Sequence, residues 1–404
     1  DVNPLVAIEN PMALLEGIDQ LDVENTIYAT TSADYEILPG FKATVRLGTE
    51  LSNVRSDTYE NDLTQIGRGL NGRATVEDDE STYWLAEYLL SYELSSGDHS
   101  LQLLGGITYE NFETRTLFNR ANDFLSNITT TNLLQSGNQE TYQLRSGKFI
   151  NRLNSQLGRI NYSYKDKYLL TASIRRDGTS RFSDKNKYAT FPSASIGWKL
   201  SEEAFMQNQS LFDELKLRVG YGEIGNQGID NFETIQTFRA GSPAVLGGSL
   251  QNGAIPARIP NEDLVWETTS ELNIGLDFGI FNRRIAGSIE YYERNTYDQL
   301  FRQPVPLTTG FNNVRVNIGQ VRNSGFDFSL RSQNLVGDLG WETDIVFSVL
   351  ENEVVDLPEF AQEIVYGGFG FSGNYLVLQE GAPIASLYGY VIDGIFQVED
   401  DIAN

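Results

Sequence analysis

Charged side chains that could contact a ligand gather where alternating apolar segments end. The stretch "RRDGTSRF" brings Arg176, Asp177 and Arg181 together, and guanidinium and carboxylate groups at this spacing could contact a polar substrate or a protein partner. The same residues could instead form ion pairs that fix the end of a strand. We favour this structural role because surface ion pairs are common.

A second group of polar residues lies in "GEIGNQGI" (222–229), where Asn226 and Gln227 offer amide donors and acceptors suited to a sugar. Turn formation explains the same amides and glycines equally well, so both interpretations stay open. The glycines of 220–225 are spaced like those of a phosphate-binding loop, but no helical pattern follows them. We therefore expect no phosphate loop here.

The side chains that serve most catalytic and metal sites are scarce. The 404 residues include no cysteine and one histidine, His99, in the turn-like "SSGDHS". Thiolate metal sites, disulfides and cysteine nucleophiles are excluded, and we expect His99 to be a solvated turn residue. The acidic run "EDDES" (77–81) lacks EF-hand spacing, so we expect a solvated loop. We predict no catalytic residue, no metal and no cofactor.

The net charge narrows the classes of partner. Lys and Arg number 30 and Asp and Glu 55, which gives −25 at pH 7. Nucleic-acid binding needs a basic surface, so we expect no nucleic-acid partner. No apolar run is long enough for a transmembrane helix, and the opening "DVNPLVAIEN" lacks the basic and apolar regions of a signal peptide.

Alternation of apolar and polar residues dominates the chain and predicts about twelve strands paired as hairpins. In "YLLTASIRRDG", Tyr168, Leu170, Ala172 and Ile174 share one face. Helical spacing is rare. The best examples of strands are 41–51, 215–222, 270–279, 325–331 and 341–349, and the best helix candidates are 11–21 and 201–209.

The connections between these strands alternate between short and long. The short ones are 38–40, 95–98, 165–166, 281–283 and 334–340, and the long ones are 52–80, 111–150, 221–262, 295–313 and 352–375, with intermediate connections at 176–187 and 201–212. Short turns on one rim and long loops on the other are typical of an outer-membrane barrel.

A soluble antiparallel sandwich also alternates apolar and polar residues, with the apolar side chains inside. Three features favour the barrel: the length of the strands, the alternation of short and long connections, and aromatic residues near strand ends. Aromatic rings at these positions suit a membrane interface. The aromatic residues concerned are Tyr35, Tyr109, Tyr162, Tyr164, Tyr168, Trp198, Tyr221, Trp266, Tyr291, Tyr292 and Trp341. Neither the opening "NPLVAIENPM" nor the final "DGIFQVEDDIAN" is typical of a strand that closes a barrel, so we expect further strands on both sides.

Several segments resemble one family, the SusC/RagA-type TonB-dependent outer-membrane transporters. The resemblance covers most of the chain, with the segments in the order of the family. They are "YLLTASIRRDGTSRF" (168–182), "ATFPSASIGWKLSEEAFM" (189–206), "LKLRVGYGEIGNQGI" (215–229), "WETTSELNIGLDFGIFNRRIAGSIEYYERNTYDQLF" (266–301), "VNIGQVRNSGFDFSL" (316–330) and "GAPIASLYGYVIDGIFQ" (381–397).

The resemblance implies a 22-stranded antiparallel transmembrane β-barrel, of which residues 1–404 would form one partial domain in the Gram-negative outer membrane. It also implies an N-terminal plug and a TonB box outside this sequence, and "LYGYVIDGIF" (387–396) as an extracellular insertion. The implied partners are a SusD-like surface lipoprotein, TonB, outer-membrane lipid and an oligosaccharide or peptide substrate. The implied activity is TonB-dependent import of that substrate, without enzyme chemistry.

Two other hypotheses stay open. One is a surface or secreted all-β binding or adhesion module, and the other is an all-β glycoside hydrolase, which would need a carboxylate pair in one cleft. In the barrel interpretation Tyr168, Leu170, Ala172 and Ile174 face lipid, while Thr171, Ser173 and Arg175 face a wet lumen. Arg176 and Asp177 would then mark the outer rim.

Overall fold

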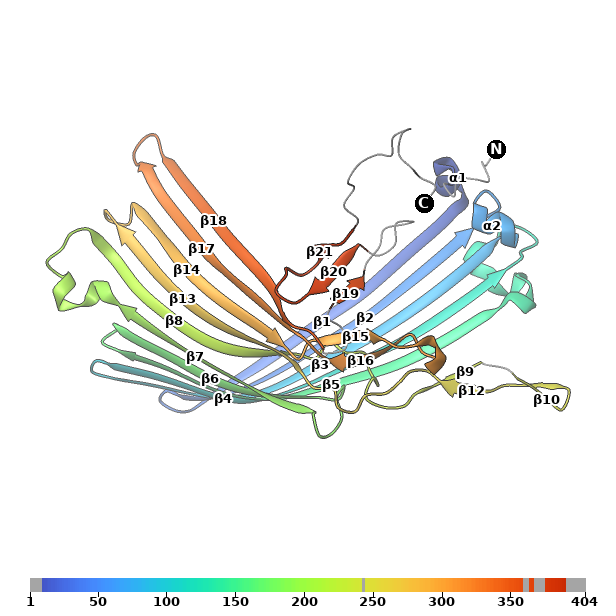
Figure 1. Cartoon of the computed structure of the whole chain (residues 1–404), viewed down its shortest axis with the longest axis horizontal. Helices are drawn as coiled ribbons and strands as arrows, with labels where there is room; N and C mark the ends of the chain where they lie inside the picture. The colour runs from blue at the N-terminus through green and yellow to red at the C-terminus, as the bar shows by residue number, and fades with distance from the viewer. Residues whose placement is uncertain (1–8, 242–243, 359–362, 367–374, 390–404) are drawn as a thin grey trace, which may run out of the picture. The chain divides into compact units, whose positions relative to one another are not determined.

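The computed structural model describes residues 9–241, 244–358, 363–366 and 375–389. Twelve strands in this part of the chain form one antiparallel sheet, in the order β1-β2-β3-β4-β5-β6-β7-β8-β13-β14-β17-β18 (Figure 1). The prediction of an all-β fold with about twelve strands is confirmed. Their bounds are β1 Ile18–Leu38, β2 Phe41–Glu60, β3 Arg73–Ser96, β4 His99–Asn122, β5 Gln143–Tyr164, β6 Tyr168–Thr179, β7 Tyr188–Lys199, β8 Phe212–Asn226, β13 Glu267–Ile280, β14 Ile285–Tyr297, β17 Gln320–Leu335 and β18 Trp341–Asp356.

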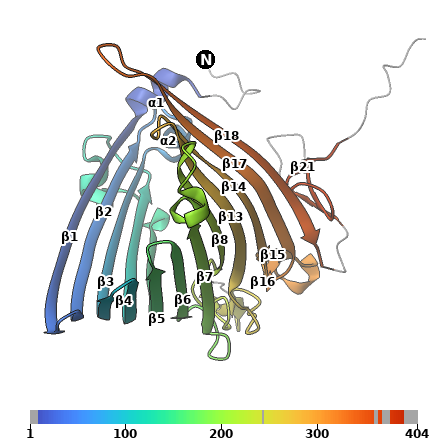
Figure 2. The same ribbon diagram turned by 90° about the vertical axis from the view of Figure 1, so that its left-hand side faces the viewer.

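Shorter elements fill the long connections. The β15–β16 hairpin lies in the connection between β14 and β17 (Figure 2). The short strands are β9 Phe238–Ala240, β10 Ala244–Leu246, β11 Ser249–Gln251, β12 Ala254–Pro256, β15 Leu300–Pro304, β16 Asn313–Asn317, β19 Glu363–Tyr366, β20 Leu376–Gln379 and β21 Ser386–Leu387. The α-helices are α1 Pro11–Gly17 and α2 Gln65–Leu70, and the 3₁₀ helices are η1 Thr130–Ser136, η2 Gln139–Thr141, η3 Leu200–Glu202, η4 Ala204–Met206 and η5 Leu307–Thr309.

The chain divides into two compact units. The first contains Asp1–Glu93, Leu103–Gly158 and Arg175–Arg181, and the second contains Leu94–Gln102, Arg159–Ile174 and Phe182–Asn404. The single partial domain over 1–404 remains a prediction. Of the family-implied insertion at 387–396, only 387–389 are among the described residues, and the final stretch 393–404 lies outside them.

Several strands extend further than the alternation predicts. Both β3 and β4 have 24 residues, so the connection expected at 52–80 shrinks to 61–72, and that expected at 111–150 shrinks to 123–142. The acidic run 77–81 is therefore part of β3 and not a loop, since its residues pair with β2. At the long-loop end of β3 both faces of the strand carry polar side chains. The apolar–polar alternation is therefore lost there, although the backbone pairing continues.

The helix predictions are partly wrong. Residues 11–17 are helical, with Asn10 Oδ1 accepting a hydrogen bond from the Met12 amide as an N-cap, but β1 begins at Ile18 within the expected helix. The segment 201–209 forms only two 3₁₀ turns. The short turns are confirmed. Between β1 and β2, Gly40 has φ +77°, and a Cβ there would lie 2.3 Å from the Glu93 carbonyl oxygen.

Buried apolar side chains gather at the long-loop ends of the strands. In the first unit, Tyr59, Ala74, Ala121 and Phe124 form a cluster where β2, β3 and β4 reach their loops. The Tyr59 and Phe124 rings meet edge-on, with centroids 5.6 Å apart. This packing folds the loops of the first unit onto the ends of their strands.

The second unit has a similar cluster, which we call the Trp266 cluster, formed by Trp266, Phe182 and Phe191. The Trp266 ring centroid lies 5.5 Å from that of Phe182 and 5.7 Å from that of Phe191, and the Leu264 side chain is fully buried. Trp266 is only 6% exposed, so its predicted place at a membrane interface is wrong. It is a core residue of the loops.

The strand bodies show the opposite pattern, with large apolar side chains exposed on one face. Ile174 of β6 is 55% exposed, Ile196 of β7 58% and Phe326 of β17 58%. Within the second unit, side chains on the other face of β6 form hydrogen bonds with neighbouring strands. Thr171 donates to Asn161 Oδ1 over 3.0 Å, and the Ser173 and Ser193 hydroxyl oxygens lie 2.7 Å apart. The alternation of exposed apolar and hydrogen-bonded residues along β6 is as predicted. The assignment of these faces to lipid and lumen stays a prediction.

Candidate functional site

An ion pair between Arg175 and Asp177 lies near the outer end of β6. Arg175 Nε lies 2.7 Å and 3.0 Å from the two Asp177 carboxylate oxygens, and its Nη2 donates to Ser155 Oγ over 3.0 Å. Residues two apart share a strand face, so the side chains of Arg175 and Asp177 lie on the same face of β6. Arg176 is exposed, and Arg181 is half-buried in the turn that follows. A substrate or partner contact by Arg176, Asp177 and Arg181 stays a prediction.

Asn226 is part of a strand and not of the loop expected at 222–229. It is the last residue of β8, and its Nδ2 donates to Glu267 Oε1 of β13 over 3.0 Å. The other oxygen of Glu267 accepts the Leu300 amide over 3.1 Å, so one carboxylate joins three segments. Gln227 follows as a half-buried loop residue. Ligand binding by Asn226 and Gln227 remains untested.

The two groups of predicted residues lie in different compact units. Arg176, Asp177 and Arg181 belong to the first unit, whereas Asn226 and Gln227 belong to the second. Each group stands at the long-loop end of its strand. Both strands extend a few residues beyond the predicted ends, β6 to Thr179 and β8 to Asn226.

The polar face of the second unit carries a three-residue ion network. Arg218 of β8 contacts Asp277 of β13 through Nε and Nη2, each over 2.8 Å, and its Nη2 also reaches Glu290 of β14 over 2.8 Å. Gly275 lies between them in the register, opposite both Arg218 and Glu290. A Cβ at Gly275 would lie 3.0 Å from Arg218 Nη2, so the glycine lets the guanidinium cross a strand.

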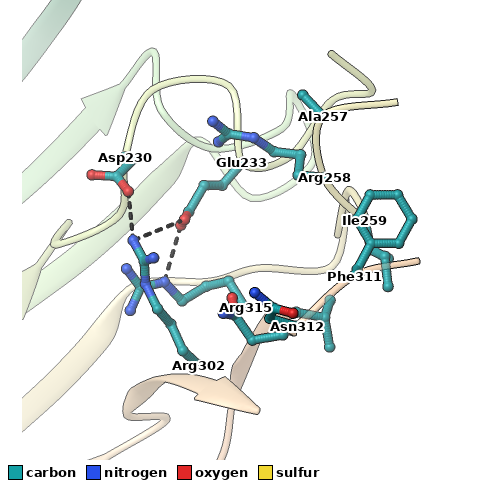
Figure 3. Close-up of a pocket in the computed structure, with 11 residues that line it drawn as sticks. Asp230, Glu233, Ala257, Arg258, Ile259, Arg302, Phe311, Asn312 and Arg315 are labelled. Atoms are coloured by element: carbon teal, nitrogen blue, oxygen red, sulfur yellow. Dashed lines mark hydrogen bonds and ion pairs between the residues drawn. The ribbon is translucent and has the colours of Figure 1, made fainter. Parts of the chain in front are cut away.

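A pocket of about 250 Å³ lies among the long loops of the second unit (Figure 3). Glu233 lines the pocket with a side chain only 10% exposed, and Arg315 Nε lies 3.0 Å from its Oε2. Arg302 Nη2 lies 2.6 Å from Asp230 Oδ2 and 3.7 Å from Glu233 Oε1. Arg258 lines the pocket, and its Nη1 donates to the Asn231 carbonyl over 3.3 Å. The pocket thus joins three arginines and two carboxylates.

Asparagine side chains fix the walls of this pocket. Asn261 Nδ2 donates to the Arg315 carbonyl over 2.9 Å. Asn317 accepts the Val265 amide and donates to the Val265 carbonyl, over 2.8 Å and 2.9 Å. Because Val265 lies between Leu264 and Trp266, these bonds tie the β15–β16 hairpin to the Trp266 cluster. The pocket is therefore built on an ordered base.

Sequence reasoning missed the residues of this pocket. Arg258 and Arg302 lie within connections that were predicted to be long, 221–262 and 295–313, but neither is part of a local motif. The folded loops bring residues together that are far apart in sequence, such as Glu233 and Arg315. A single sequence offers no pattern that identifies such a pair.

Other chemistry is limited in the described part of the chain. No three His, Cys, Asp or Glu side chains there converge to hold a metal ion. No helix there has the length and hydropathy of a membrane-spanning helix. His99 is exposed, as expected, but it begins β4 instead of lying in the turn, and its Nδ1 is 2.7 Å from the Tyr162 hydroxyl. Its ring packs on Tyr164, with centroids 4.8 Å apart.

Comparisons with known proteins identify the family. A family model described as TonB dependent receptor-like, beta-barrel, matches residues 14–384. TonB-dependent receptor P3 of Formosa agariphila is 34% identical over 399 residues, which cover 96% of this chain and 39% of that protein. TonB-dependent receptor SusC of Bacteroides thetaiotaomicron is 31% identical over 359 residues, which cover 86% of this chain and 35% of that protein.

Solved structures agree on the fold. The RagAB peptide transporter superposes with a TM-score of 0.82 at 21% identity, over 92% of this chain and 40% of that chain. This chain spans well under half the length of the relatives it matches, and the likeness at this identity concerns the fold alone. The chain belongs to the TonB-dependent receptor β-barrel family, is of the SusC/RagA type and is an outer-membrane protein.

Proposed function

We propose that this chain forms part of the barrel wall and of the outer loops of a transporter that imports oligosaccharides or peptides through the outer membrane. A SusD-like lipoprotein would deliver the substrate at the long-loop rim. TonB would drive passage by acting on a plug that is outside this sequence. The chain itself would carry out no covalent chemistry.

The contrast between the two faces of the strands carries this proposal. One face exposes large apolar side chains such as Ile174, Ile196 and Phe326, which in a soluble sandwich would pack against a second sheet. The other face carries hydrogen-bonded polar groups, including the Arg218 network. A sheet that is apolar on one face and polar on the other suits a wall between lipid and a wet lumen.

The polar face suggests how a substrate would pass. Arg218 is held by two carboxylates, so the proposed lumen presents charged groups that are fixed by ion pairs at this point. A hydrophilic substrate can exchange hydrogen bonds with such a wall without binding it tightly. We place the first contacts at the long-loop rim, with Arg176, Asp177, Arg181, Asn226 and Gln227 as candidate residues.

The names of similar proteins mention only one of the two substrate classes. The structure with a TM-score of 0.82 is named as a peptide transporter, whereas the name of SusC mentions no substrate. The experiment therefore compares the two classes directly. The full-length gene is deleted in its native host, and growth is measured on oligosaccharides and on peptides as the sole carbon source, with and without TonB.

We expect growth on one class to be lost on deletion, and to be lost equally when TonB is deleted. Pull-down of the full-length protein from detergent-solubilised outer membranes should recover a surface lipoprotein. A full-length protein that is soluble and monomeric without detergent would instead support the binding or adhesion module. Cleavage of the substrate by the purified protein would support the glycoside hydrolase.

A further inference from the structure

We propose that the loop pocket around Arg258, Arg302 and Arg315 is a subsite for an acidic sugar unit of an oligosaccharide. This inference rests on the proposed transport function and narrows its substrate class. The pocket lies at the long-loop end of the second unit, where an incoming substrate arrives before the lumen. The bound group is anionic, a carboxylate or a sulfate on the sugar ring.

The charges of the pocket leave one arginine for a ligand. Glu233 and Asp230 neutralise Arg315 and Arg302 through the ion pairs that Figure 3 shows. Arg258 forms no ion pair with a carboxylate in the described part of the chain, and its hydrogen bond to the Asn231 carbonyl uses one N–H. A guanidinium has five N–H donors, so Arg258 retains donors for a bidentate contact with an anion.

The positive charge of Arg258 lies in a chain that is otherwise strongly negative. The chain has a net charge of −25, so its long-range field repels anions. A pocket with three arginines and two carboxylates is a local exception to that field. The Glu233 carboxylate, which contacts both Arg302 and Arg315, has a side chain only 10% exposed. An anion that binds in this pocket would form hydrogen bonds with donors whose positions are already fixed.

The remaining walls suit a sugar ring. Phe311 and Ile259 contribute apolar surface, and Asn312 and Asn313 contribute amide groups. A sugar ring offers C–H groups on one face and hydroxyls at its edge, so it can use both kinds of wall. The volume of about 250 Å³ is near the lower end of ligand pockets, which fits one ring and not a long segment.

A peptide fits this pocket less well. Extended peptides are commonly bound by pairing with a free strand edge. Here part of the nearby backbone is already bonded. The Arg315 carbonyl accepts from Asn261, the Val305 amide donates to the Asn312 carbonyl over 3.1 Å, and β15 pairs with β16. The pocket therefore offers side chains for recognition, which favours the sugar.

The test uses the full-length receptor in detergent and titration calorimetry with matched ligands. The probes are oligosaccharides from a polyuronate and from a sulfated galactan, each with its carboxyl-reduced or desulfated counterpart, and a tetraglutamate peptide. We expect at least one acidic oligosaccharide to bind, and its neutral counterpart to bind about 10- to 100-fold more weakly, as the loss of a charged hydrogen-bond pair implies. The two arms distinguish a carboxylate from a sulfate.

The variants locate the effect. Arg258→Gln should remove the preference for the acidic ligand, Arg258→Lys should keep part of it, and Arg239→Gln, in exposed β9 outside the pocket, should change nothing. Equal binding of acidic and neutral ligands, no binding of either, or an acidic preference that survives in Arg258→Gln would overturn the proposal. Binding of the peptide that is lost in Arg258→Gln would move the site to another ligand class.

The failure of this inference is distinguishable from the failure of the proposed function. If TonB-dependent growth persists and the Arg258→Gln variant binds as the wild type does, only the acidic subsite is wrong. If the acidic ligand binds at Arg258 but no substrate is imported with TonB, the subsite stands and the transport function is wrong.

Discussion

The loop ends and the strand bodies of the second unit use apolar residues in opposite ways. At the loop ends, Trp266, Phe182 and Phe191 pack against one another and are almost fully buried. Along the strands, Ile174 and Ile196 expose more than half of their surface. The same residue types thus form a conventional core in one region and an outer surface in the other.

This difference shows which parts of the chain depend on the membrane. A buried cluster is stabilised by its own packing, because its apolar side chains are removed from water by other side chains of the same protein. The apolar face of the strands is exposed in the protein itself, so only lipid or detergent can remove it from water and provide the same stabilisation. We therefore expect substitutions in the loop core to lower stability in any solvent. Substitutions on the apolar strand face should instead lower stability or assembly only through their contact with lipid or detergent.

The largest expected effect concerns the loop core. Trp266→Ala removes the ring that joins Phe182 and Phe191, and we expect a loss of about 3–5 kcal/mol in the unfolding free energy of the full-length receptor. Denaturant unfolding in detergent measures it. Trp341→Ala is the matched control, because Trp341 is 58% exposed at the start of β18. If both variants lose the same stability, the contrast between loops and strands is wrong.

The next effect concerns the polar face. Arg218→Ala leaves Asp277 and Glu290 facing each other without their cation, and we expect a loss of about 1–3 kcal/mol for the unsatisfied charged groups. Arg218→Lys should lose less, because one ammonium cannot reproduce the bidentate contact but keeps the charge. The same unfolding assay applies. An Arg218→Ala variant as stable as the wild type would show that the network adds nothing to the wall.

A smaller effect separates the two faces of β6. Ile174→Asp places a charge on the exposed apolar face, whereas Ser173→Asp places it on the hydrogen-bonded face. We expect a cost for Ile174→Asp below the roughly 2–4 kcal/mol known for Arg or Lys at the bilayer midplane, and a smaller cost for Ser173→Asp. The amount of each variant in isolated outer membranes measures assembly. Equal amounts would refute the assignment of the faces.

The smallest effect depends on pH and concerns the short connection between β7 and β8. Tyr168 and Trp198 donate hydrogen bonds to Glu203 Oε1 over 2.6 Å and 3.0 Å, and these bonds lower the pKa of the Glu203 carboxyl below its ordinary value of 4.5. This contribution is present above pH 4.5 and is lost as the pH falls through the lowered pKa.

Unfolding of the full-length receptor at pH 7 and pH 3 tests this coupling. The wild type should lose more stability on acidification than Glu203→Gln, which cannot titrate at this position. Other carboxylates contribute equally to both proteins, so the difference reports Glu203. An identical acid response of the two proteins would contradict the hydrogen-bonded arrangement.

The sequence predicted the strand bodies well because their physical cause is local. Alternation along β6 or β8 follows from side chains that point to opposite faces, and this needs no knowledge of the rest of the fold. The short turns were predicted for the same reason, since Pro39 and Gly40 form one within a few residues. The family resemblance then supplied what periodicity alone left open, the choice between barrel and sandwich.

The loops were predicted poorly because their contacts are long-range. The extension of β3 through 77–81 depends on pairing with β2, which acidic side chains do not reveal. Trp266 looked like an interface residue because the alternation ends near it, yet it packs on Phe182 and Phe191. The pocket around Arg258 depends on three loop segments, so its residues have no shared pattern in the sequence.

The central claim is that alternate residues of β6 face lipid and lumen, and spin-label accessibility tests it most directly. Single nitroxide labels at each position of 169–174, in the full-length receptor in lipid vesicles, would be exposed in turn to oxygen, which enters lipid, and to a water-soluble nickel complex. The account predicts a two-residue period, with Leu170, Ala172 and Ile174 accessible to oxygen and Leu169, Thr171 and Ser173 to nickel. A profile without this period, or with the two sets reversed, would contradict it.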